Sequence, residues 1–192
     1  MIYTKIYSPP PINRKEVLRY ASSPKGTDEI NALVDECIEE TTNSFAYRLC
    51  YEEFDVSLAT EFFGKYASQT LTKYLDGCKS FVLFAATVGA DIDRKIARES
   101  KASPSKAYIL NALAAERIES LCNLFCSELK TQKAKENLCA KPRISTGFGD
   151  MPLDMQKDIF RILDCPRKIG VSLGESMLMT PRKSVTAIVG MY

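Results

Sequence analysis

The chain has 192 residues, of which 45% are hydrophobic and 26% charged, so its composition excludes a fibrous or disordered protein and fits one globular domain. The 26 Lys and Arg residues nearly balance the 24 Asp and Glu residues, which argues against a nucleic-acid partner held by charge. No histidine is present, which excludes Ser-His-Asp and Cys-His catalytic sites and imidazole metal ligands.

The N-terminal segment predicts one short strand and two helices. Apolar and polar residues alternate over 2–7 before three prolines, which is typical of a strand that ends where the backbone loses its donors. A helix is expected to begin near Asn13. A second helix is expected between Thr27, a suitable N-cap, and about Thr41, because its apolar residues recur at helical spacing.

The next segment predicts two strands around a short helix. Aromatic and aliphatic residues alternate over 45–51, as in a half-buried strand. A helix opened by Ser68 should run to Leu75, with Gly77 at its left-handed C-terminal cap. Residues 81–87 are apolar on both faces, so this strand should lie in the centre of a covered sheet.

The longest predicted element is a helix over about 104–136. It follows a shorter helix around 92–96, and it is opened by Ser103 as a side-chain cap and by Pro104 in the first turn. No glycine or proline interrupts it before Pro142. We expect this helix to lie centrally in the fold.

The C-terminal segment predicts a helix over about 153–163 and short strands over 169–173 and 185–189. Strands and helices interleave without a regular βαβ rhythm. The sequence therefore predicts an α+β fold, with a twisted, mostly antiparallel or mixed sheet packed with helices.

The cellular setting is inferred from the cysteines and from the apolar runs. Seven cysteines, an odd number, and an N-terminus without an apolar signal core favour a reducing, cytoplasmic environment. The longest apolar run, near 81–86, is far shorter than the roughly 20 residues of a membrane helix. We therefore expect a soluble protein that does not contact a membrane.

Two pairs on the long helix are candidates for chemistry. Cys122 and Cys126 lie four residues apart, as a metal or redox pair does, but no CxxC accompanies them, so we interpret them as packing residues and predict no metal site. Glu116 and Glu119 lie three residues apart and either reach a substrate or form a solvated face.

The segment over 143–150 combines groups that can cooperate on one ligand. The guanidinium of Arg143 can bind a carboxylate with two parallel hydrogen bonds, and Gly147 and Gly149 allow a ligand to approach the backbone. The ring of Phe148 can cover a flat base or a sulfonium charge. The alternative is a surface arginine before an ordinary glycine turn.

The segment after Arg143 contains a long ordered pattern of residues. In chain order these are Arg143, Gly147, Phe148, Pro152, Ile169, Gly170, Glu175, Ser176, Met179, Pro181, Ser184 and Val185. In this pattern the chain resembles the activation domain of cobalamin-dependent methionine synthase, in its short stand-alone form, and a weaker resemblance reaches back to about residue 81. We therefore expect a single unit over 1–192, with a variable N-terminal part over 1–80 and a family-like core over 81–192.

The resemblance implies a domain that binds S-adenosylmethionine and presents its methyl group to a cobalamin carried by a methionine synthase polypeptide in trans. An electron from a flavodoxin-like donor would accompany the methyl group. Without histidine the chain has no cobalamin-binding DxHxxG motif of its own. The chain would be an accessory part of a methyltransferase in methionine biosynthesis, with no catalytic residue and no independent activity.

The resemblance also implies which residues hold the ligand. Arg143 would bind the methionyl carboxylate, and the turn over 147–149 would line the ligand together with Thr146. Phe148 stands where the family usually has tyrosine, so the hydroxyl is lost. The remaining site residues implied in this way are Glu119 and Glu175.

Two alternative functions belong to other classes. A docking module for a corrinoid protein would keep the fold but no longer bind S-adenosylmethionine; the aromatic residues that follow the family's Ser-Val pair are absent after Val185. A free methyltransferase of the doubly wound type is disfavoured, because its Gly-rich strand-to-helix loop is missing.

Overall fold

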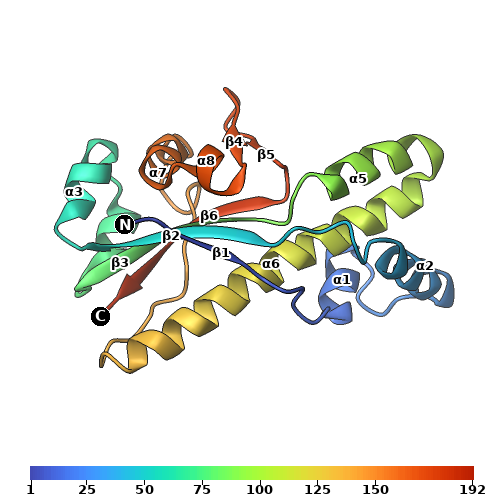
Figure 1. Cartoon of the computed structure of the whole chain (residues 1–192), viewed down its shortest axis with the longest axis horizontal. Coiled ribbons are helices and arrows are strands. Elements are labelled where there is room, and N and C mark those ends of the chain that lie inside the picture. Colours follow the sequence, from blue (N-terminus) through green and yellow to red (C-terminus); the bar gives the residue numbers. More distant parts are fainter.

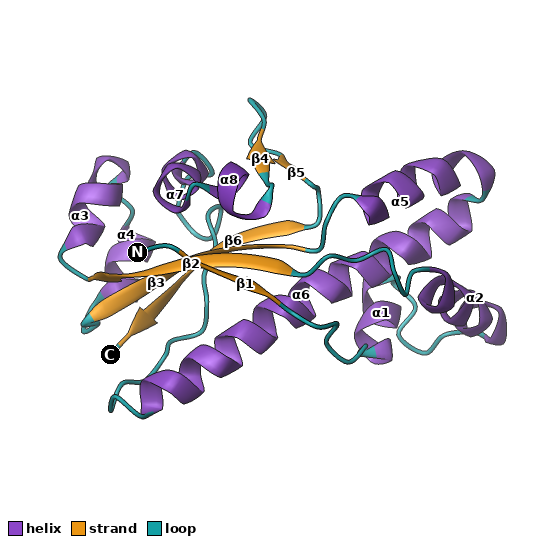
Figure 2. Ribbon diagram, in the orientation of Figure 1, coloured by secondary structure: helices purple, strands orange, loops and turns teal.

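The computed structural model describes residues 1–192 and is built on a four-stranded sheet (Figure 1). Its strands lie in the order β1 (Tyr3–Ile6), β2 (Arg48–Asp55), β3 (Ser80–Thr87) and β6 (Ser184–Met191). Every neighbouring pair is antiparallel. Helices cover both faces of the sheet (Figure 2). The predicted α+β class is confirmed.

Strand β3 is the centre of the molecule. It pairs with β2 on one side and β6 on the other, and seven of its eight residues are buried. Phe84 points into the core on one face of the sheet, and Phe81 and Leu83 point into the core on the other. The prediction of a central, covered strand over 81–87 is confirmed.

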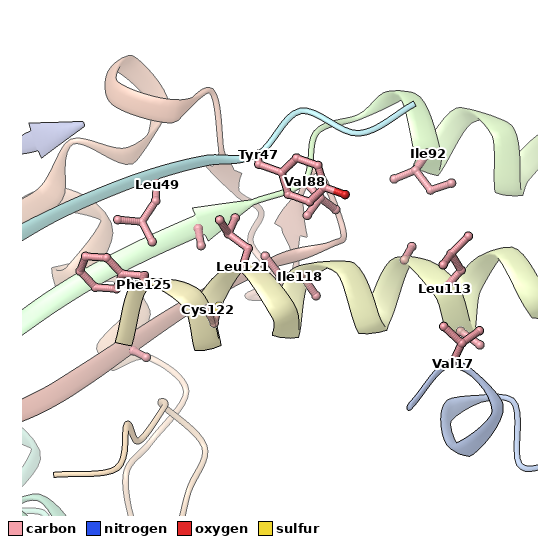
Figure 3. Packing of buried hydrophobic residues seen from close by; sticks show 14 of the residues in the cluster. Val17, Tyr47, Leu49, Val88, Ile92, Leu113, Ile118, Leu121, Cys122 and Phe125 are labelled. Atoms are coloured by element: carbon pink, nitrogen blue, oxygen red, sulfur yellow. The ribbon is translucent and has the colours of Figure 1, made fainter. Parts of the chain in front are cut away.

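The first face of the sheet packs on α6 (Pro104–Ala134), a helix of 31 residues. Leu121, Cys122 and Phe125 of this helix point toward the sheet, where Phe125 packs against Phe84 of β3 (Figure 3). The helix was predicted over about 104–136. The predicted cap is wrong in one detail, because the side chain of Ser103 accepts no capping hydrogen bond.

Three helices pack on the N-terminal half of α6, away from the sheet (Figure 1). They are α1 (Arg14–Tyr20), α2 (Asp28–Glu40) and α5 (Asp91–Ala102). The side chain of Thr27 caps α2, as the sequence predicted, and α1 begins after Asn13, whose side chain caps it. None of the helices in the structure combines the length and apolarity needed to cross a lipid bilayer.

The second face of the sheet carries shorter helices. They are α3 (Leu58–Phe63) with the 3₁₀ turn η1 (Gly64–Tyr66), α4 (Gln69–Leu75), α7 (Met155–Leu163) and α8 (Cys165–Ile169). The sequence predicted α4, with Ser68 as its cap and Gly77 at positive φ, and it predicted α7. It predicted neither α3 nor α8.

Two predicted strands are wrong in position. The strand expected over 45–51 is β2, which begins at Arg48 and continues to Asp55 in full register with β3. Of the five residues expected as a strand over 169–173, the first, Ile169, ends helix α8, and Gly170 follows it at φ +71°, outside the extended region. Only β4 (Ser172–Leu173) remains, and it forms a small hairpin with β5 (Met179–Thr180).

A buried ion pair fixes the N-terminal segment on α6. Arg117 pairs with Glu116 at 2.6 Å, and their side chains are 1% and 2% exposed. Arg117 also donates to the carbonyls of Pro10 and Pro11 at 2.6 and 2.9 Å, and Glu116 accepts from the backbone N–H of Asn13 at 3.0 Å. Glu116 is therefore a structural residue. Both alternatives that the sequence left open for it, a contact with a substrate and a place on a solvated face, are wrong.

Candidate functional site

The segment over 139–144 lies along the outer edge of β6 and positions Arg143. The N–H of Lys141 donates to the carbonyl of Gly190 at 2.8 Å, and Ile144 exchanges two backbone hydrogen bonds with Ile188 at 3.0 and 2.8 Å. These bonds set the alternation of side chains along the segment. Ile144 packs against the hydrophobic core on the second face of the sheet, whereas the side chain of Arg143 contacts residues of α6.

Arg143 is held by two residues of α6. Its Nη2 donates to Glu119 and pairs with it, and its Nη1 donates to the amide oxygen of Asn123 at 2.6 Å. Burial lowers the pKa of Arg143, but the neighbouring thiol of Cys122 and the carboxylate of Glu119 outweigh it and raise the pKa above its ordinary value. The sequence placed Arg143 and Glu119 in one site, and the structure brings them together.

A guanidinium has five N–H donors, so these two partners leave donors free for a ligand. An open pocket of about 580 Å³ adjoins the side chain of Arg143. Lys130 and Lys141 also line it, which makes the pocket basic. The arginine is thus partly neutralised within the protein, but the space beside it is open.

The cysteine pair lies next to this arginine. Cys122 is fully buried in the core, and Cys126 lines the basic pocket. Burial raises the pKa of Cys126, and the nearby Arg143 only partly offsets this effect. A thiol with a raised pKa is mostly protonated at neutral pH, which disfavours metal binding or nucleophilic attack. No cluster of three or more His, Cys, Asp or Glu side chains in the structure is suited to a metal ion.

The turn after Arg143 requires its glycines. Gly147 has φ +87° and its N–H donates to the carbonyl of Met151 at 2.9 Å. Gly149 has φ +59°, and a Cβ atom there would clash with Oγ1 of Thr70. The ring of Phe148, between them, is 61% exposed. An exposed ring on a glycine turn is free to cover a ligand, as the sequence predicted for it.

Asp150 attaches this turn to helix α4. Its carboxylate accepts from Oγ of Ser68 at 2.6 Å and from the N–H groups of Gln69 and Thr70 at 2.9 and 3.0 Å. These hydrogen bonds hold the pKa of Asp150 far below its ordinary value. The carboxylate satisfies donors of the first turn of α4 that have no partner within the helix.

We expect Asp150→Asn to lower the unfolding temperature at pH 7. Because the folded-state pKa is depressed, the carboxylate stabilises the fold above the unfolded-state pKa of about 3.9, and this contribution is lost as the pH falls through the folded-state value. Calorimetric scans should therefore show a difference in unfolding temperature between wild type and variant, and this difference should become smaller below about pH 4. Asp76→Asn, at the other end of α4, is the control; a difference independent of pH would contradict the role of the charge.

Three buried oxygens beside this turn have no hydrogen-bond partner. They are Oγ1 of Thr146, Oε1 of Gln156 and Oγ1 of Thr186, and all three residues line one cavity of about 210 Å³. Buried polar groups are usually paired, so a polar cavity with three free acceptors is suited to a bound ligand or water. The sequence placed Thr146 in the site. Gln156 and Thr186 were not predicted, because no sequence pattern marks a residue that lacks a partner.

We expect Thr186→Val to raise the free energy of unfolding by about 1 kcal/mol in the absence of ligand, since it removes a buried hydroxyl that has no partner. Thr87→Val is the matched control, because Thr87 is equally buried but its hydroxyl accepts from Oγ of Ser184 at 2.9 Å and from the N–H of Gly89 at 3.1 Å. Urea titrations should give opposite signs for the two variants. Equal losses would mean that the Thr186 hydroxyl is satisfied in solution.

Glu175 lies in the turn between β4 and β5, is exposed, and forms no hydrogen bond or ion pair with Arg143 or Glu119. The other predicted residues, Thr146 and Gly147 to Gly149, continue directly from Arg143 along one loop. Arg143 and Thr146 nevertheless line two different hollows, the basic pocket and the polar cavity, which share no lining residue.

Comparison with models of known protein families, and with curated proteins, found no match to the sequence. Among solved structures the chain is similar to the crystal structure of the MetH reactivation domain bound to AdoHcy. The TM-score is 0.70 at 14% sequence identity, and the match covers 99% of this chain and 78% of the other. The chain therefore has the fold of the MetH reactivation domain.

Proposed function

We propose that the chain binds S-adenosylmethionine and presents its methyl group to a corrinoid cofactor carried by another polypeptide. The observation that carries the proposal is Arg143, held with free N–H donors beside an open basic pocket, in a fold whose solved relative is bound to AdoHcy. An arginine in this state is suited to the carboxylate of an amino-acid ligand.

The residues around Arg143 fit the other parts of such a ligand. Glu119 supplies a negative charge next to the carboxylate site, which suits the ammonium and sulfonium charges of S-adenosylmethionine. Thr146 and the turn over 147–149 would line the ligand, with Phe148 as a cover. Glu175 would take part only if the β4–β5 hairpin moved toward the ligand.

The partner in this proposal is a cobalamin-binding methionine synthase polypeptide in trans, with a flavodoxin-like protein as electron donor. The corrinoid supplies a cobalt that accepts the methyl group. Transfer from a sulfonium to a reduced metal needs no proton shuttle, which is consistent with a chain that has no histidine. The work of this chain is to orient the donor.

Titration calorimetry with S-adenosylmethionine and with AdoHcy tests the proposal. We expect heat from both ligands and a loss of affinity of about 30-fold or more in Arg143→Ala, since a charged hydrogen-bonded partner is removed. Arg161→Ala, which removes an exposed arginine of α7, is the control and should bind like the wild type. Absence of heat with a folded wild-type sample would refute ligand binding by the isolated chain.

The second candidate function is a docking module that has lost the methyl donor. It is favoured by the contacts of Arg143 with Glu119 and Asn123, which already occupy two of its terminal nitrogens. This function predicts binding to a cobalamin protein that is unaffected by Arg143→Ala. Wild type and Arg143→Ala should each be co-purified with a cobalamin-loaded synthase that lacks its own activation domain. Binding of both proteins to the synthase, without calorimetric heat from S-adenosylmethionine, would favour the docking module.

A further inference from the structure

A second cleft lies between α5 and the β4–β5 hairpin and has no role in the function proposed above. Its volume is about 540 Å³, within the range of small-molecule sites. It shares no residue with the basic pocket beside Arg143, and it meets the small polar cavity only at Gln156 and Met179. Half of the residues that line it are hydrophobic.

Two cations line this cleft without a partner. The side chains of Arg182 and Lys183 form no hydrogen bond and no ion pair. The one carboxylate in the lining, Asp93, accepts from the backbone N–H of Arg182 at 2.6 Å. Burial lowers the pKa of Lys183, and Asp93 only partly offsets this effect. The cleft therefore has uncompensated positive charge.

An unpartnered polar group lies on the wall that the cleft shares with the polar cavity. The side chain of Gln156, at the start of α7, is buried with 6% exposure, and its Oε1 atom has no hydrogen-bond partner. A buried amide oxygen without a donor costs stability in the free protein. A ligand or water with an N–H or O–H group at this point would remove that cost.

The remaining walls are apolar and rich in sulfur. Met177, Leu178 and Met179 come from the hairpin, and Ile96 comes from α5. Leu178 is 64% exposed, so its side chain is accessible to a ligand in the cleft. Methionine thioethers make favourable contacts with aromatic rings. These walls are suited to a flat ring.

We propose that this cleft binds a small aromatic anion, a carboxylate or a phosphate ester, with the anionic group at Arg182 and Lys183 and the ring between the hairpin and α5. Two separate features support this ligand class, the free cations and the apolar wall with two thioethers, whereas the amide oxygen of Gln156 would accept from an additional N–H or O–H group of the ligand. The assignment does not depend on binding of S-adenosylmethionine.

Calorimetry with three probes of one shape tests the charge requirement. The probes are 1-naphthyl phosphate, 1-naphthylacetate and the neutral 1-naphthaleneacetamide, each added to the full chain. We expect at least one anion to bind about 10-fold or more tightly than the amide, since charged hydrogen bonds are the stronger ones. The better of the two anions identifies the natural anionic group. Equal affinity for all three probes, or no binding, would overturn the proposal.

Variants locate the binding. Arg182→Gln with Lys183→Met should reduce anion affinity to that of the neutral amide, whereas Lys101→Met, a cation of α5 outside the cleft, should not change it. Gln156→Leu should raise the unfolding temperature of the free protein, since it removes an amide oxygen that is buried without a partner, and should leave the affinity for the two anions unchanged, because neither anion has a hydrogen to donate to that oxygen. Anion affinity that survives the double substitution would place the site elsewhere and refute the assignment.

Discussion

Replacing Arg117 by alanine is expected to lower the free energy of unfolding by about 3–5 kcal/mol. The substitution leaves the carboxylate of Glu116 buried without its cation and removes the donors to the carbonyls of Pro10 and Pro11. An uncompensated buried charge is among the most destabilising changes known in proteins. The chain has no tryptophan, so urea titrations should be followed by far-UV circular dichroism.

Two further variants separate the buried charge from the loss of a side chain. Arg161→Ala removes an exposed arginine paired with Asp158 and should cost no more than about 1 kcal/mol. Glu116→Gln combined with Arg117→Met removes both charges and should recover part of the stability lost in Arg117→Ala. If Arg117→Ala behaves like Arg161→Ala, the pair does not hold the N-terminal segment.

Replacing Glu119 by glutamine is expected to weaken S-adenosylmethionine about 10-fold and to weaken AdoHcy less. The two ligands have the same carboxylate and ammonium groups, but only S-adenosylmethionine has the sulfonium charge. A carboxylate next to Arg143 favours the more positive ligand. Competition calorimetry on the folded variant gives the ratio of the two affinities directly.

Glu128→Gln is the matched control, because Glu128 is also an acidic residue of α6 paired with a cation, Lys5, at 3.0 Å. It should not change either affinity. If Glu119→Gln lowers the affinity for both ligands equally, Glu119 positions Arg143 and does not interact with the sulfonium charge. Tighter binding of both ligands would mean that Glu119 competes with the ligand carboxylate for the guanidinium of Arg143.

The sequence predicted the elements in which a periodic pattern of apolar residues extends over many positions, or in which a capping residue marks the end. Helix α6 has many apolar positions at helical spacing, α2 begins at a capping threonine, and β3 is apolar on both faces. Helices α3 and α8 have six and five residues, which is too short for a period to stand out. The segment over 45–51 alternates, yet β2 begins only where its backbone meets β3.

The contact between Arg143 and Glu119 was predictable from the resemblance, which placed both residues in one site, and the structure brings their side chains together. The unpartnered oxygens of Gln156 and Thr186 were not predictable, because an absent partner is a property of the packed structure. The role of Asp150 was not predictable either, because the helix that its carboxylate caps lies about 80 residues earlier in the chain.

The pairing of β3 with β6 delays completion of the sheet during synthesis on the ribosome. Thr87 and Ser184, which meet at one end of this pair, are 97 residues apart. At typical translation rates β6 emerges about 5 to 20 s after β3. Throughout that interval a strand with seven buried residues has one unpaired edge, which is the kind of edge that promotes aggregation. We expect nascent chains stalled before residue 184 to depend on chaperones.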